Sequence, residues 1–166
     1  MVSATYLQKT TVSAIYLLHG WLTQRISTQG LTWLEQKIKQ IKSGVNTSMF
    51  FSAFSAVPRY IGKNDLELTI EELKAATTLR TGWNPSQWSV DQAARTLLIL
   101  TLPQDDPEKY LRTLAQVFTA ADVGELVALY QALPLLPYPE QLRDRAAEGV
   151  RSNMTAVFNA VALRNP

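Results

Sequence analysis

Apolar positions recur every three to four residues along most of the chain, which is the spacing of one face of an α-helix. Three such stripes are Leu31, Leu34, Ile38 and Ile41; Leu111, Leu114, Val117 and Phe118; and Val123, Leu126, Val127, Tyr130 and Leu133. Residues 93–102 are apolar on nearly every side after Arg95 and Thr96, which is typical of a helix enclosed by its neighbours. The pattern predicts an all-α fold with this segment at its centre.

Helix starts are marked by capping boxes, in which a small oxygen acceptor stands three residues before a side chain that can bond back to the cap N–H. Four pairs match: Thr32 and Glu35, Thr69 and Glu72, Ser89 and Gln92, Asp122 and Glu125. Proline at the first helical position predicts two further starts, at Asp106-Pro107 and Tyr138-Pro139. We expect helices to begin near residues 28–32, 69, 89, 106, 122 and 138, with residues 66–70 as an extended lead-in.

Short connections rich in proline and glycine join these helices, so sequence neighbours should pack antiparallel. We expect antiparallel helical hairpins, stacked as a HEAT-like α-α superhelix or packed as an irregular helical bundle. A chain of 166 residues that is 46% hydrophobic is long enough to bury one core, and we expect residues 1–166 to form a single domain.

Composition narrows the possible chemistry. The chain has no cysteine, so it offers no disulfide or thiolate site, and a reducing cytoplasm is the simplest location. Sixteen basic against 14 acidic residues leave a net charge of +2, too little for a nucleic-acid surface. Lys37, Lys39 and Lys42 read as a solvated face, with a Glu35 to Lys39 pair. With His19 as the single histidine and no glycine-rich loop, we expect no metal and no cofactor.

The segment 14–22 is the most apolar part of the N-terminal region, but it is too short to cross a membrane. We expect it to be a helix that enters the core. Tyr16 and Trp21 would also suit a membrane interface, which leaves open a peripheral association with the inner face of the membrane.

Two groups of side chains are candidates for binding a ligand or partner. Trp83 and Trp88 stand in or beside a loop, where large aromatics need a reason, so a pocket and the core are nearly equal alternatives. Spacing of three places Glu148 between Arg145 and Arg151, with Asn153 nearby. Bridging between hairpins is the favoured explanation for this second group, ahead of ligand binding. The pair Asp105-Asp106 could suggest magnesium, but helix capping by Asp106 is favoured.

Several long motifs resemble the EboA family of metabolite-traffic proteins. They are Phe54-Ser55-Ala56-Val57-Pro58-Arg59-Tyr60, Asp91-Gln92-Ala93-Ala94-Arg95, the helix from Asp122 to Tyr130, and the closing segments Leu133–Glu140, Arg145–Met154 and Val157–Pro166. The match is densest over residues 88–166, and Arg95 within it is a further candidate binding residue. None of these motifs is a catalytic signature, so no catalytic residue is assigned.

The resemblance implies a part in a gene-cluster-encoded pathway of secondary metabolism that moves a biosynthetic precursor from the cytoplasm toward the periplasm. Three functions compete. The first is a non-catalytic accessory of metabolite transport that binds a hydrophobic small molecule, other proteins of the same gene cluster, or both. The second is a helical scaffold or adaptor with no small-molecule ligand. The third is an enzyme on an isoprenoid-like or aromatic substrate, which would need convergent carboxylates or a poised base that the sequence does not show.

Overall fold

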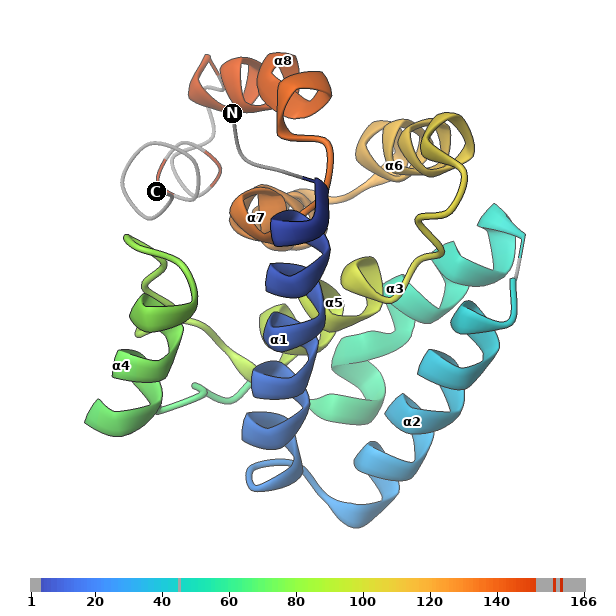
Figure 1. The fold of residues 1–166 in the computed structure, drawn as a ribbon. Helices are drawn as coiled ribbons and strands as arrows, with labels where there is room; N and C mark the ends of the chain where they lie inside the picture. Colours follow the sequence, from blue (N-terminus) through green and yellow to red (C-terminus); the bar gives the residue numbers. More distant parts are fainter. Residues whose placement is uncertain (1–3, 45, 152–156, 158, 160–166) are drawn as a thin grey trace.

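The computed structural model describes residues 4–44, 46–151, 157 and 159, and these residues form a helical body (Figure 1). The helices are α1 (Ala4–Thr23), α2 (Thr28–Lys42), α3 (Thr47–Ile61), α4 (Ile70–Leu79), α5 (Val90–Leu100), α6 (Pro107–Ala120), α7 (Val123–Ala132) and α8 (Pro139–Val150), with a 3₁₀ turn at Leu133–Leu135. Within the described residues, strand-like pairing is limited to one antiparallel bridge between Asp65 and Ser89. The predicted all-α fold is confirmed.

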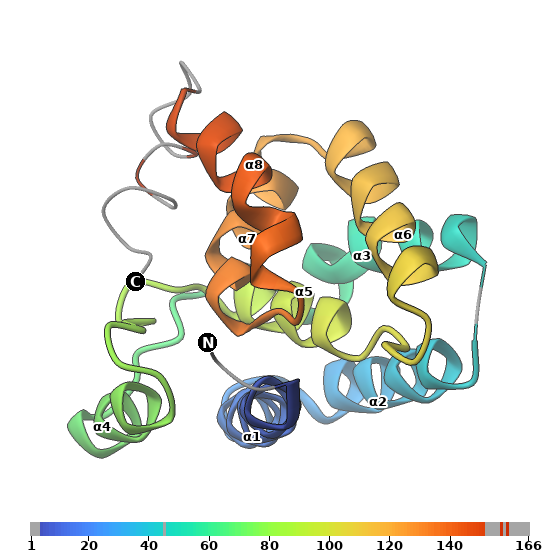
Figure 2. The same cartoon turned by 45° about the horizontal axis from the view of Figure 1, so that its top comes forward.

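Helix α5 occupies the centre, as its apolar sequence predicted (Figures 1 and 2). It packs against α1, α2, α3 and α7, and every residue from Val90 to Leu100 except Gln92 is buried. The main contacts of α5 therefore join helices that are far apart in the sequence. A HEAT-like stacking of successive hairpins is not confirmed by this arrangement.

Local sequence signals set most helix starts. The side chains of Glu72, Gln92 and Glu125 accept hydrogen bonds from the cap N–H groups of Thr69, Ser89 and Asp122, at 2.8, 3.0 and 3.1 Å. Proline begins α6 and α8. Five of the predicted starts therefore have the local chemistry expected of them.

The predicted capping box at Thr32 is wrong. Ser27 caps α2 instead, because its hydroxyl lies three residues before Gly30 and accepts the N–H of Gly30 at 3.0 Å. Thr32 then falls inside the helix, where its hydroxyl donates to the carbonyl of Thr28 at 2.9 Å. Glu35 is left free to turn toward α1, which matters for the candidate site.

An ionic cluster around Arg95 joins α3, α5 and α7 in the interior. The Arg95 Nε donates to the backbone carbonyl of Phe54 at 3.2 Å, and the guanidinium lies over the Phe54 ring, 5.5 Å from its centroid. Its two other nitrogens lie 3.5 Å from Asp91 Oδ2 and 3.8 Å from Glu125 Oε1. All three charged side chains are close to fully buried.

The cluster holds one cation and two carboxylates, so a negative charge remains to be balanced. Asp91 and Glu125 both lie in the first turn of their helices, where the helix dipole supplies about half a positive charge. The Ser89 hydroxyl also donates to Asp91, and the Asp122 N–H donates to Glu125. The two helix N-termini therefore stabilise the excess charge that Arg95 does not neutralise.

Residues 66–88 form an excursion that contains α4 and returns to its starting point. The N–H of Leu66 donates to the carbonyl of Trp88 at 2.9 Å, and the N–H of Val90 donates to the carbonyl of Asn64 at 2.8 Å. These two bonds close the base of the excursion immediately before α5 begins. The central helix therefore starts from a fixed point.

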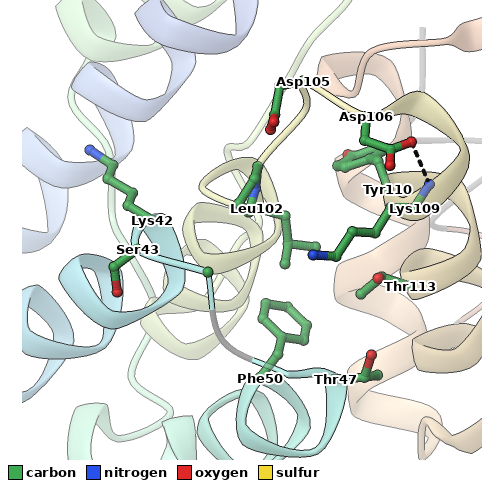
Figure 3. Close-up of a pocket in the computed structure, with 12 residues that line it drawn as sticks. Lys42, Ser43, Thr47, Phe50, Leu102, Asp105, Asp106, Lys109, Tyr110 and Thr113 are labelled. Atoms are coloured by element: carbon green, nitrogen blue, oxygen red, sulfur yellow. Dashed lines mark hydrogen bonds between the residues drawn. The ribbon is translucent and has the colours of Figure 1, made fainter.

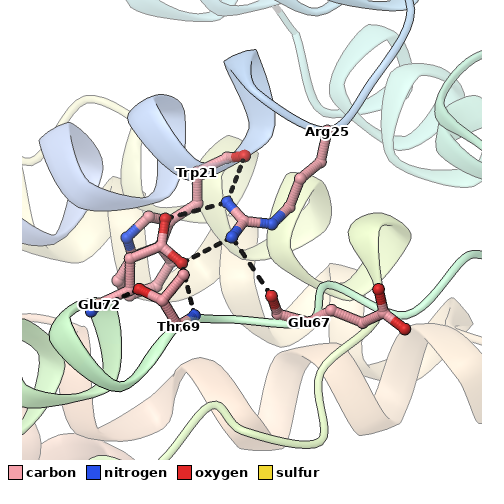
Figure 4. Close-up of polar contacts among 5 residues, drawn as sticks. All are labelled: Trp21, Arg25, Glu67, Thr69 and Glu72. Atoms are coloured by element: carbon pink, nitrogen blue, oxygen red, sulfur yellow. Dashed lines mark hydrogen bonds and ion pairs between the residues drawn. The ribbon is translucent and has the colours of Figure 1, made fainter.

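Arg25 fastens this excursion to the end of α1 (Figure 4). Its guanidinium donates to both carboxylate oxygens of Glu72, at 3.1 and 2.6 Å, and also to the carbonyls of Trp21 and Glu67. Such a two-point pairing fixes direction as well as distance. Burial raises the pKa of the Glu72 carboxyl, but hydrogen bonds from Arg25 and the Thr69 N–H outweigh it and hold that pKa below its usual 4.5.

Replacing Arg95 with methionine should lower the free energy of unfolding by about 3–5 kcal/mol, because two buried carboxylates lose their cation. Urea unfolding followed by circular dichroism measures the change. The matched control is Arg143→Met, since Arg143 pairs with Glu140 on the surface with both side chains 74% exposed. That control should change stability by less than about 1 kcal/mol, and an equal loss in both variants would contradict the role given to Arg95.

Glu72→Gln should change how stability depends on acid. Because the folded-state pKa of Glu72 is lowered, its charge contributes stability that is fully present above pH 4.5 and is lost as pH falls through the folded value. The free energy of unfolding of the wild-type protein should therefore exceed that of Glu72→Gln at neutral pH, and this difference should disappear below pH 4.5. Glu71→Gln, in the same first turn of α4, is the control and should show a smaller gap.

Candidate functional site

The two tryptophans singled out by the sequence belong to the core. Trp83 and Trp88 are 1% and 2% exposed, and their ring centroids are 5.9 Å apart. Trp21 of α1 adds a third ring, 5.7 Å from Trp83. This cluster anchors the excursion 66–88 to α1. Trp83 also lines an open hollow beside α4 together with Ile70 and Leu73.

Arg95 and the polar group of α8 lie in separate places. Arg95 is buried between its two carboxylates and the Phe54 carbonyl, so it is not open to a ligand. Arg145 pairs with Glu148 at 3.1 Å and lies over the Phe118 ring, 5.3 Å from its centroid. This contact bridges α8 to α6. Arg151 is exposed, and the described ion pair of Glu148 is with Arg145 alone, so the expected clamp is half formed.

Asn153, the last of the candidate residues, lies outside the described residues. The other six do not converge on one site. The two tryptophans pack beside α4 and Arg95 lies at the centre of the fold. Arg145 and Glu148 lie on α8, and Arg151 comes directly after it. Burial chiefly raises the pKa of the Tyr130 hydroxyl, Glu148 raises it further, and Arg145 opposes both. Tyr130 belongs to α7, so its hydroxyl lies within electrostatic reach of Glu148 and Arg145 on α8.

A different site emerges between α1 and α2. Both helices pack on α5, and they diverge from the short connection 24–27 that joins them (Figure 1). The groove between them has a volume of about 570 Å³. Its apolar lining comes from three elements: Val12, Ile15 and Tyr16 on α1, Ile38 on α2, and the buried Leu97 of α5 as the floor. Val12 and Tyr16 are 67% and 79% exposed, so the groove is open to solvent along α1.

Polar side chains lie at the ends of this groove. His19 Nε2 is 3.0 Å from Glu35 Oε1, and this contact crosses from α1 to α2 near their connection. The predicted pair between Glu35 and Lys39 is therefore replaced by a contact between helices. Lys39 and Lys42 line the other end, toward the C-terminus of α2.

A second hollow, of about 280 Å³, lies between the end of α2 and the start of α6 (Figure 3). Phe50, Leu102 and Tyr110 contribute its apolar surface, and its polar surface comes from Lys42, Ser43, Thr47, Asp105, Asp106, Lys109 and Thr113. Asp106 accepts the N–H of Lys109 at 3.1 Å, so it caps α6 as predicted. Lys42 lines both hollows, which places them side by side.

These surfaces are suited to binding. Within the described part of the chain, no group of three or more His, Asp and Glu side chains is placed to hold a metal ion. A search of the same residues finds no helix with the length and apolar character needed to cross a membrane. The α1–α2 groove combines an apolar floor, apolar walls and a few charged groups, which is the usual make-up of a small-molecule site.

The structure is thus that of an all-α protein with an open apolar groove between its first two helices. A family model described as metabolite traffic protein EboA matches residues 14–166. The chain therefore belongs to the EboA family. No curated protein and no solved structure matches it.

The sequence of α1 contains more apolar residues than one buried face needs, and this excess is a signal for the groove. Helix α1 buries Ala14, Leu18, Trp21 and Leu22. Val12, Ile15 and Tyr16 are apolar residues outside this buried set, so α1 has more apolar surface than its own packing uses. Only the position of α2 shows that this surplus surface faces Ile38 and the lysines.

Tyr110→Phe should make the protein less sensitive to alkali. The Tyr110 hydroxyl is buried with no hydrogen-bond partner among the described residues, and burial, followed by the effect of Tyr138, raises its pKa well above 10. The wild-type protein should lose stability relative to Tyr110→Phe as pH rises above 10, by up to about 1.4 kcal/mol per pH unit, because only the unfolded tyrosine ionises there. Tyr16→Phe, at an exposed site, is the control for urea unfolding at each pH.

Proposed function

We propose that this protein is a non-catalytic accessory of metabolite transport, and that the α1–α2 groove takes up a hydrophobic small molecule. The observation that carries the proposal is the groove itself, with apolar side chains from α1, α2 and α5 around one volume of about 570 Å³. Small-molecule sites span roughly 300–1,000 Å³ and have mostly apolar linings. The metabolite-traffic description of the family supports cargo binding over a structural role.

The groove stays open on the side of Val12 and Tyr16, and this openness suits a protein that must release what it binds. A carrier hands its cargo to other proteins, so other members of the same gene cluster are the proposed partners. The cytoplasm, next to the inner face of the membrane, is the proposed location of this exchange.

An open apolar groove also favours the second function, that of a helical adaptor, because an amphipathic helix of a partner could lie in it. The two functions differ in what occupies the groove. A small apolar molecule in solution should bind the isolated protein if the groove serves a metabolite. A groove made only for a partner helix would leave such a molecule unbound at the same concentration.

Val12→Asp should weaken the binding of N-phenylnaphthylamine, an uncharged dye whose emission rises in apolar surroundings, by roughly tenfold or more. An aspartate in the groove wall would have to lose water when the dye binds, and the apolar contact of valine would be lost as well. Titration of the protein with the dye measures the dissociation constant.

The matched control is Val123→Asp, the same substitution at a valine that is 48% exposed at the start of α7. This variant should bind the dye as the wild-type protein does, and both variants should retain the wild-type circular dichroism spectrum. Absence of dye binding to the wild-type protein, or equal binding by Val12→Asp, would contradict the proposed groove. Native mass spectrometry that finds only a protein partner would favour the adaptor.

A further inference from the structure

Charge is distributed unevenly along the α1–α2 groove. Near the connection between the helices, His19 and Glu35 are in contact, so the carboxylate there already has a partner. At the opposite end, Lys39 and Lys42 line the groove, and the described residues place no carboxylate within ion-pair distance of either ammonium. The groove is therefore apolar along most of its lining and positively charged at the end formed by Lys39 and Lys42.

Both lysines lie in the last turn of α2, where a cation is favourable for the helix dipole. The last carbonyls of α2 also have hydrogen-bond donors other than these two ammonium groups. The Ser43 N–H donates to the backbone carbonyl of Lys39 at 3.2 Å, and the Ser43 hydroxyl donates to the carbonyl of Gln40 at 2.8 Å. The Gly44 N–H donates to the carbonyl of Ile41 at 3.1 Å. The two ammonium groups are not needed to cap the helix.

The electrostatic balance at this end stays positive. Two ammonium groups carry two charges, and the C-terminal end of α2 opposes them with about half a negative charge. About one and a half positive charges therefore remain at this end, on side chains that are exposed to solvent, so their attraction for an anion is screened by salt.

Lys42 also borders the second hollow, and Lys109 lines that hollow from the side of α6 (Figure 3). Figure 3 shows the Lys42 side chain directed away from Lys109, so the two ammonium groups do not approach one another. Hydroxyl groups of Ser43, Thr47 and Thr113 line the same hollow.

We propose that the ligand of the groove is an amphiphile with an anionic head, whose apolar body lies between Val12, Ile38 and Leu97 and whose head is held by Lys39 and Lys42. The inference rests on the proposed function and adds the chemical class of the ligand. The source is a free, monomeric amphiphile rather than a membrane surface, because the apolar lining lies between two helices with Leu97 of α5 beneath it, and a single chain fits such a groove better than a flat surface does.

The test compares decanoate, decanol and decyltrimethylammonium, which share a chain length and differ in head charge. The decanoate and the cationic amphiphile are titrated below their micelle concentrations, and decanol below its solubility limit, against the bound naphthylamine dye. Decanoate should displace the dye at a concentration about ten times lower than decanol, and the cationic amphiphile should be the weakest. The advantage of decanoate should shrink as ionic strength rises.

The double variant Lys39→Gln with Lys42→Gln should bring decanoate to the level of decanol and leave decanol unchanged. The matched control is Lys37→Gln with Lys63→Gln, which removes the same charge at an α2 lysine bonded to Gln40 and at an exposed residue after α3. The control should keep the preference for decanoate. A loss of preference in both double variants would show an effect of net charge and overturn the proposal.

The outcomes separate the two claims. If dye binding depends on Val12 but decanoate and decanol compete equally, the groove binds apolar molecules, and the proposal that its ligand has an anionic head is wrong. If the dye does not bind through Val12, the proposed function itself fails. Co-sedimentation with vesicles of phosphatidylcholine containing anionic phosphatidylglycerol is the last arm. Binding to these vesicles through Lys39 and Lys42, without any preference for decanoate, would make the surface a membrane contact and overturn the proposal.

Discussion

The Arg95 guanidinium is the group on which the central packing depends. An isolated buried charge is strongly unfavourable, and a buried pair is tolerated when its partners are held in place. Asp91 lies one turn before Arg95 on α5, but Glu125 comes from α7 and the Phe54 carbonyl from α3. The burial of one side chain therefore requires three helices to meet in a defined arrangement. Apolar packing alone would permit many more.

The central position of α5 also explains why a groove exists. Helices α1 and α2 both cover α5, and each contacts α5 more than it contacts the other. The contact between His19 and Glu35 joins them near their connection, and beyond it they diverge. Leu97 belongs to the core and at the same time forms the floor of the groove. The surface that can bind a ligand is thus a direct result of how the core is covered.

Signals that act within one turn of helix could be predicted well from the sequence. The boxes at Thr69, Ser89 and Asp122 depend on residues three apart, and each formed as expected. Thr32 met the same rule and did not cap, because the Ser27 cap starts the helix before it. Glu35 contacts His19, 16 residues away, instead of pairing with Lys39 on its own helix. Competition between a local partner and a distant one is decided by packing, which spacing does not show.

The candidate residues show the same limit. For Trp83 and Trp88 the sequence leaves pocket and core as nearly equal alternatives, and in the structure Trp83 packs against Trp88 and against Trp21 from a distant helix. Arg95 is a candidate because it lies in the segment that resembles the EboA family, and its role in the structure depends on Glu125, 30 positions later. The pattern of the α2 lysines predicts a solvated face, and Lys39 and Lys42 are exposed, but these two also border the apolar groove between α1 and α2.

The clustering of aromatic rings has a practical consequence for spectroscopy. Three of the four tryptophans, Trp21, Trp83 and Trp88, lie in one buried cluster at the junction of α1 with the excursion 66–88. Trp33 is stacked on Tyr60, with ring centroids 4.5 Å apart, on the face between α2 and α3. The intrinsic emission of the protein should therefore report chiefly on the attachment of α4, so detachment of that segment would be visible while the rest of the helical body remained folded.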